Sequence, residues 1–190
     1  MRKSLLAAAL VATPVILPAA ASAAPSVLVV DLDKVLNECT ACRAATAAIK
    51  SQVQAGQARA QALDAQLKPE LQAIETAGQA LGGKEPDAAL KKRAADFQTR
   101  QQAAQAELAA KQRSIESTQA NVQQQIANRV VLISEQVRVR RQADIVIGKN
   151  ATLASNPAAD VTAEVLTALN AQLPSVSVTP LPQQSPGTGR

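Results

Sequence analysis

The segment from Asp87 to Ala143 contains no Gly or Pro and is dense in Ala, Gln, Glu, Lys and Arg. These residue types favour helix at nearly every position. A helix of this length spans about 85 Å, at about 1.5 Å per residue, whereas helices in globular proteins average about 11–12 residues. Because a chain of 190 residues cannot bury such a helix in a compact core, we expect a long exposed arm.

Apolar side chains on this helix recur at heptad-like intervals, which predicts the seam of a two-helix coiled coil. The partner helix is predicted from Lys34 to Leu81, with a bend or break near Pro69. Many seam and neighbouring positions are Ala or Gln, and each missing buried methylene forgoes about 0.8 kcal/mol. We therefore expect a loose tip and a firmer base near Val130. The predicted seam residues are Leu90, Phe97, Ala104, Leu108, Ile115, Val122, Ile126, Val130, Ile133 and Val137.

Glycines and a proline mark the connection between the two helices. Gly82 and Gly83 can end the first helix, and Pro86 can open the second at its first position. A short turn between two long helices makes an antiparallel hairpin. The arm is therefore predicted over residues 34–142, with its turn at residues 82–86.

Short strands are predicted on both sides of the arm. Residues 26–32 are apolar and β-branched, and Asp33 is the predicted N-cap of the following helix. After the arm, residues 143–147 and 151–154 predict two further strands, separated by a turn. Since the hairpin returns the chain to its start, these strands can pair in one small sheet.

A short helix and a polar tail are predicted at the C-terminal end. Asp160 is the expected N-cap of the helix, and Pro174 ends it. Residues 175–190 are rich in Pro, Ser, Gln and Gly and are predicted to be disordered. The apolar face of this helix consists of Val161, Val165, Leu169 and Leu173.

The predicted fold is mainly α with a small β body: a long antiparallel helical hairpin projecting from a short-stranded sheet that oligomerises. Residues 24–33 and 143–174 form this body. A sheet of about three strands with one helix buries too little apolar surface to be stable alone. We therefore expect several copies to share a core, through Val27, Val29, Ile145, Val146 and Ile147.

Residues 1–23 have the features of a secretory signal peptide. Arg2 and Lys3 are followed by the apolar run Leu5 to Leu17 and by the small residues Ala21-Ser22-Ala23. We expect cleavage after Ala23 and export of the remaining chain.

The composition argues against several functional classes. The chain has no His, Trp or Tyr and one Phe, so it lacks the commonest general base and metal ligand and the aromatic platforms on which nucleic-acid bases stack. We expect no catalytic residues, cofactor, metal or nucleic-acid partner. The formal net charge of +5 includes Arg2 and Lys3 of the predicted signal peptide.

Cys39 and Cys42 have the C-x-x-C spacing of thiol oxidoreductases. Redox catalysis would also require a thioredoxin-type fold that lowers the pKa of one thiol, and nothing in the sequence predicts one. In an oxidising compartment the pair would instead form a local or intersubunit disulfide.

Both ends of the chain resemble the OmpH/Skp family of periplasmic chaperones. Residues 27–31 with Val35 and Leu36 resemble its first strand and helix start. The most telling segments are C-terminal: residues 143–147 (ADIVI), Asn150-Ala151 and residues 160–166 (DVTAEVL). A Cys pair is not part of this pattern.

The resemblance implies a homotrimer in the periplasm, with three hairpins enclosing a cavity. Such a trimer holds unfolded outer-membrane β-barrel proteins without ATP and prevents their aggregation. Diffuse client contacts are then expected at Lys91, Lys92, Arg93, Phe97, Arg100 and Leu108. Some family members also carry a basic lipopolysaccharide-binding site on the arms. Here the basic cluster of Lys91, Lys92 and Arg93 with Lys84 and Arg100 could bind lipopolysaccharide or contact a membrane surface.

Each of these assignments has a simpler alternative. The basic cluster can be an ordinary solvated face balanced by nearby acids. Phe97 can pack in the seam. Residues 138–141 (RVRR) can line a positive cavity mouth or stabilise the negative end of the helix dipole. The whole chain can also be a structural coiled-coil adaptor of the cell envelope, which would need a defined docking tip.

Overall fold

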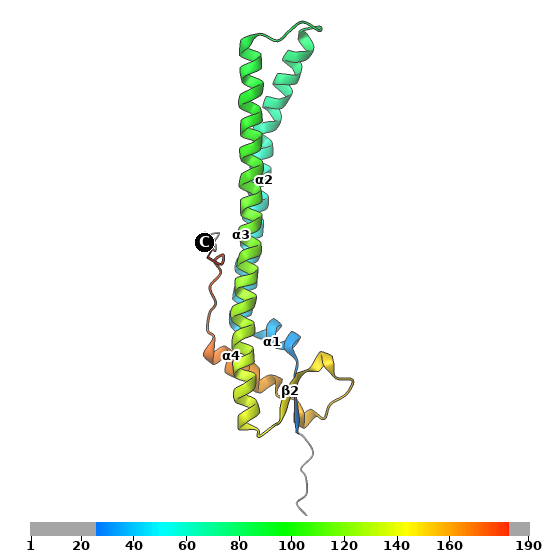
Figure 1. Cartoon of the computed structure of the whole chain (residues 1–190), viewed down its shortest axis with the longest axis vertical. Coiled ribbons are helices and arrows are strands. Elements are labelled where there is room, and N and C mark those ends of the chain that lie inside the picture. Colours follow the sequence, from blue (N-terminus) through cyan, green and yellow to red (C-terminus); the bar gives the residue numbers. More distant parts are fainter. Residues whose placement is uncertain (1–25, 183–190) are drawn as a thin grey trace, which may run out of the picture.

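The structure, a computed structural model, describes residues 26–182. Figure 1 shows a long helical hairpin rising from a small base, where the strands and the short helices gather. The predicted mainly α hairpin with a small sheet is thereby confirmed, and the predicted signal peptide lies outside the described residues. In chain order the elements are β1 (Val27–Val30), α1 (Leu32–Glu38), α2 (Thr40–Ala80), α3 (Ala88–Arg140), β2 (Ile145–Gly148), the 3₁₀ turns η1 (Lys149–Ala151) and η2 (Pro157–Ala159), and α4 (Thr162–Gln172).

The sheet contains two parallel strands within the described residues. Val27 lies opposite Ile145, and Val30 lies opposite Gly148. Parallel strands need a long crossover connection, and the whole arm serves as that crossover here. The predicted third strand at 151–154 is wrong, because the Thr152 N–H and hydroxyl both donate to the Lys149 carbonyl and close a turn. Besides β2, Asp160 makes an isolated bridge to β1, beside Val29.

The first helical region is divided by an elbow that the sequence did not reveal. The N-cap of α1 is Asp31 rather than Asp33, and the Asp31 carboxylate accepts the Lys34 N–H at 2.9 Å. Cys39 then adopts an extended conformation, with φ −62° and ψ 132°, before α2 begins. The chain therefore turns from body to arm at Cys39.

The arm itself is continuous. Pro69 lies inside α2 without breaking it, although Figure 1 shows the distal end of α2 leaning away from α3. Gly82 and Gly83 both adopt positive φ in the turn, where a side chain would be strained. The predicted role of Pro86 is wrong, because the Asp87 carboxylate caps α3, which begins at Ala88.

Buried side chains are densest at the base of the arm and sparser toward the tip, as the seam composition predicts, although Phe97 and Ala104 are more buried than Leu108 and Ile115. Of the predicted seam, Leu90, Leu108 and Ile115 are half-buried and the others are buried. Thr118 is also buried, and its hydroxyl donates to the Ser114 carbonyl. The main apolar core lies at the base and includes Val35, Cys39, Cys42, Ile126, Val130, Ile133, Val137, Val165 and Leu169.

The C-terminal segment connects the body to the arm. Asp160 accepts the Thr162 N–H at 2.9 Å at the start of α4, and Asn170 on α4 accepts the Thr40 N–H at the start of α2. Beyond α4, the chain runs up alongside the hairpin (Figure 1). The prediction of disorder is wrong for residues 175–182, which bond to arm side chains, while residues 183–190 lie outside the described range.

Candidate functional site

A groove at the base joins α3 to β2. Val131 and Ile145 on its walls are 67% and 46% exposed. The two-stranded sheet leaves the outer edge of β2 without a strand partner among residues 26–182. The groove is lined by Val30, Leu32, Val130, Val131, Ser134, Glu135, Arg138, Asp144, Ile145, Val146, Ile147 and Gly148. The base therefore presents apolar side chains beside an open sheet edge.

The structure separates the five residues that the sequence assigned to a shared core. Val27 and Ile145 are exposed, and Val146 and Ile147 are half-buried. Val29 is only 2% exposed and packs within its own chain, so it is not available to another copy. The other four residues are at least partly exposed, and the three on β2 line the groove together with Val131 of α3.

A second groove crosses the middle of the arm. It is lined by Val53, Gly56 and Ala60 on α2 and by Leu108 and Ile115 on α3, together with polar residues. Gly56 leaves the Ile115 side chain 3.9 Å from where a Cβ would stand. Small residues at the seam thus leave Leu108, one of the expected client-contact positions, half-exposed in a shallow apolar depression.

Phe97 is in the seam rather than on the surface. Its exposed fraction is 8%, so packing in the hairpin, the alternative stated from sequence, describes it better than client contact. In the described hairpin the Phe97 side chain is therefore buried, as the seam prediction expects, and a client contact at Phe97 stays a prediction.

The basic cluster near the tip is largely paired with acids. Lys91 bonds Glu85, Lys92 bonds Asp96 at 2.7 Å, and Arg100 bonds Glu70. Such exposed pairs contribute about 0–1 kcal/mol each. They favour an ordinary solvated face over a lipopolysaccharide site. Further down the arm, Arg59 binds Glu107 through two hydrogen bonds, which lower the pKa of the Glu107 carboxyl.

The arginines at the end of α3 hold neighbouring segments together. Arg138 pairs with Glu135 and also donates to the Ala143 carbonyl at 2.8 Å. Arg140 and Arg141 both bond the Glu164 carboxylate of α4. These arginines therefore form neither a free positive ring nor a contact with the helix dipole alone, because they pair with the carboxylates of Glu135 and Glu164. Hydrogen bonds from Arg140 and Arg141 lower the pKa of Glu164.

Replacing Glu164 with Gln tests how much the ion pairs of Glu164 with Arg140 and Arg141 stabilise the fold. Since the folded chain lowers the Glu164 pKa, the carboxylate stabilises the fold at neutral pH, and that contribution fades as pH falls below the ordinary value of 4.5. The arginines are more than half exposed, so we expect a loss below about 1 kcal/mol at neutral pH. In urea titrations, the difference between wild type and variant should shrink below pH 4.5; a difference that grows there would contradict the assignment.

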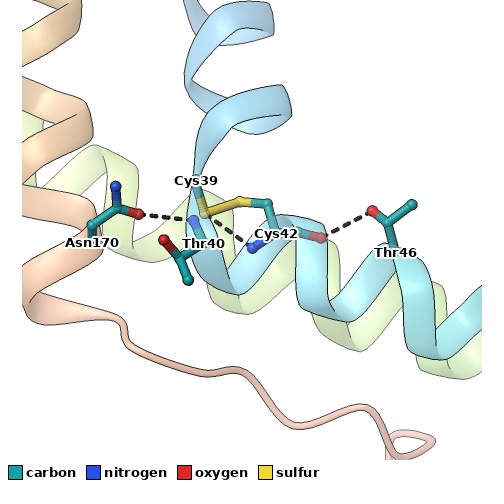
Figure 2. The surroundings of a disulfide bond; sticks show 5 residues. All are labelled: Cys39, Thr40, Cys42, Thr46 and Asn170. Atoms are coloured by element: carbon teal, nitrogen blue, oxygen red, sulfur yellow. Dashed lines mark hydrogen bonds between the residues drawn. A yellow bond between two sulfur atoms is a disulfide. The ribbon is translucent and has the colours of Figure 1, made fainter.

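The two cysteines form a disulfide at the elbow between body and arm. Figure 2 shows the bond at the first turn of α2, beside Asn170 of α4. The Cys39 sulfur also accepts the Cys42 N–H at 3.1 Å. Because both sulfurs belong to one chain, the alternative of an intersubunit disulfide does not apply.

Burial of this disulfide argues against thiol exchange with a protein substrate. Cys39 and Cys42 are 0% and 5% exposed, whereas exchange requires a thiolate to approach one sulfur directly. The pair lies in the core cluster with Val35, Val165 and Leu169. The disulfide is therefore a structural bond, which fixes the elbow at Cys39 to the first turn of α2.

Removing this bond should destabilise the base. For Cys39→Ala with Cys42→Ala, loop closure alone predicts a loss of about 2 kcal/mol in the free energy of unfolding. Urea titration of oxidised wild type, reduced wild type and the double variant measures it. Reduced wild type and the variant should both fall below the oxidised chain, and equal stability of all three would contradict a structural role.

The described chain offers neither a membrane span nor a metal centre. Among residues 26–182, no helix has the length and apolar character needed to cross a bilayer. The same residues bring together no group of three or more His, Cys, Asp or Glu that could hold a metal ion.

Comparison with known proteins gives the family. The family described as outer membrane protein (OmpH-like) matches residues 26–169, which is most of the chain. The chain belongs to the OmpH-like family. The match covers both long helices, both strands and most of α4, and it ends before the segment that lies along the arm.

The fold of this OmpH-like chain is similar to that of a solved structure from Caulobacter crescentus CB15, described as a candidate outer membrane chaperone (OmpH-like). The TM-score is 0.70 at 22% identity, and the match covers 85% of this chain and 95% of that chain. At this identity the likeness concerns the fold alone. No curated protein matches this chain.

Proposed function

We propose that this OmpH-like protein is a periplasmic, ATP-independent holdase that binds unfolded outer-membrane β-barrel proteins. The observation that carries the proposal is the long, thinly packed hairpin projecting from a small body. Family membership and the similarity to a candidate outer membrane chaperone support it.

The arm suits weak contact with many sequences. Its seam is sparse toward the tip, and the half-exposed depression around Leu108 and Ile115 is shallow and apolar. Strands of unfolded barrels carry apolar side chains on one face and aggregate in water. Scattered shallow contacts can shield those side chains without a dedicated pocket, and exposed Lys and Arg residues along the arm would speed the capture of acidic clients.

A homotrimer is part of the proposal. A two-stranded sheet is marginal on its own, and the base leaves the edge of β2 and the side chains of Val131 and Ile145 open. Copies that cover these surfaces would gain apolar burial. Arms projecting from a shared base would then enclose a space for the client.

Dilution of urea-unfolded porin tests the holdase. With the chain from Ala24 to Arg190 present and no nucleotide added, light scattering should fall well below that of porin alone. A matched variant, Leu108→Asp, places a charge in the arm depression and should suppress aggregation less. Scattering that is the same with and without the protein would end the proposal.

The structural adaptor predicts a different result. An adaptor would bind one folded partner at fixed stoichiometry through the turn at residues 82–86 and would leave porin aggregation unchanged. The porin assay therefore separates the two functions.

A further inference from the structure

The C-terminal tail lies along the arm in an extended conformation. Within residues 175–182, Val176 and Val178 pack against the core cluster, while Ser177 between them and Thr179 after them are exposed. This alternation is that of a β-strand with one face on a surface. The segment begins directly after α4 and runs up beside α3 (Figure 1).

Three side chains of α3 bind the tail through its main chain. Gln125 accepts the Ser177 N–H at 2.9 Å and donates to the Ser177 carbonyl at 3.0 Å. Asn121 donates to the Thr179 carbonyl at 2.9 Å. Ser117 accepts the Leu181 N–H at 2.9 Å. None of these bonds depends on which side chain the tail residue carries.

The spacing of these contacts matches a helix to a strand. Ser117, Asn121 and Gln125 are four residues apart, which is about 6 Å along a helix. Their partners are two residues apart, which is about 6.6 Å along an extended chain. One helical turn of α3 therefore meets every second residue of an extended segment that runs antiparallel to it. The register persists over about two turns, from Ser117 to Gln125.

The first helix of the hairpin, α2, also binds the tail. Gln52 on α2 donates to the Val178 carbonyl at 3.1 Å, so the tail backbone is bound from both helices. Gln52, Ser117, Asn121 and Gln125 together are called the peptide track below. They are side chains with neutral donors and acceptors that lie beside an apolar seam.

We propose that the peptide track is a binding site for an extended, unfolded polypeptide with alternating apolar residues, and that the chain's own tail occupies it as a competitor. The ligand class follows from the occupant, a strand held by its main chain with Val176 and Val178 inward. Barrel strands have this alternation. The inference deepens the proposed holdase function and rests on it for the identity of the natural ligand.

Competition between the tail and a free peptide tests the proposal. The probe is a fluorescent synthetic peptide with the sequence of residues 175–182, added to the chain from Ala24 to Arg190. In wild type the tethered tail acts at an effective concentration of about millimolar. In Val176→Asp with Val178→Asp, the tail should leave the track, and peptide affinity measured by anisotropy should rise about tenfold. Equal affinity for both proteins, or no binding by either, would overturn the proposal.

The track residues are tested in that released variant. Adding Gln125→Ala removes both bonds to Ser177 and should weaken peptide binding about tenfold, because each net hydrogen bond is worth about a factor of three to ten. Gln123→Ala is the matched control, since Gln123 is exposed on the same helix. A loss that is the same for both variants would refute a role for the track.

Hydrogen exchange in otherwise unaltered protein provides a measurement that does not need the released variant to fold. The Ser177 amide should exchange slowly in wild type and in Gln123→Ala, and rapidly in Gln125→Ala. Rapid exchange of Ser177 in wild type would show that the tail is not seated and would overturn the proposal.

The porin assay separates this inference from the proposed function. If wild type suppresses porin aggregation but peptide binding ignores the tail and Gln125, the track is refuted and the holdase stands. If the peptide binds as described but porin aggregates freely, the track stands and the holdase is refuted.

Discussion

Leu169→Ala is expected to lower the free energy of unfolding by about 2–5 kcal/mol. Leu169 is 0% exposed and belongs to the core cluster where α4 packs against α1 and α3. Residues 26–182 contain no second apolar cluster of similar size that could compensate, because buried side chains become sparser along the arm. A loss of this size is a large share of the stability of an ordinary domain, which is about 5–15 kcal/mol.

Urea denaturation followed by circular dichroism measures this loss, at one protein concentration because self-association would add stability. Leu71→Ala is the matched control, since Leu71 is 39% exposed on the arm. We expect a loss of less than about 1 kcal/mol for the control. Similar losses for both substitutions would mean that the base is not the stable part of the molecule.

Val131→Asp is expected to convert the proposed homotrimer to monomers. Val131 is 67% exposed on α3 and lines the groove beside the open edge of β2. Its side chain points away from the core, so a charge there should leave the single chain folded. In an interface between copies the same charge would be buried without a partner, at a cost of several kcal/mol.

Light scattering during gel filtration gives the mass of wild type and variant. Wild type should elute as three copies and Val131→Asp as one, with the helical circular dichroism signal unchanged. Leu71→Asp is the control on the arm and should keep the wild-type mass. A monomeric wild type would refute the trimer directly, and a trimeric variant would place the interface elsewhere.

Local sequence signals predicted the arm because they act within one helix. Ala- and Gln-rich sequence without Gly or Pro makes helix the lowest-energy local state over α3, and the heptad-like spacing defines which face is buried. The positive φ values at Gly82 and Gly83 likewise follow from residues that tolerate them. The resemblance of the two ends indicated the family, which the OmpH-like match supports and which helical periodicity alone could not indicate.

Boundaries were predicted less well, because competing residues of similar chemistry lie close together. Asp31 and Asp33 both suit an N-cap, and packing of Val35 into the core selects the helix that begins after Asp31. Pro86 suits a first helical position, yet the Asp87 carboxylate caps the helix one residue later. Pro69 remains in α2 because the flanking residues continue the helix on both sides.

Tertiary structure alone decided three features of this chain. The elbow at Cys39 depends on α4, whose Asn170 accepts the Thr40 N–H. The pairing of Arg140 and Arg141 with Glu164 depends on how α3 meets α4. The path of residues 175–182 depends on Gln125, about fifty residues earlier in the chain. The sequence by itself determined the helical arm, its seam and its thinning toward the tip, since these follow from local propensity and spacing. Contacts between distant segments have no local sequence signal. Only the folded chain therefore determined the elbow at Cys39, the ion pairs of Glu164 and the path of residues 175–182.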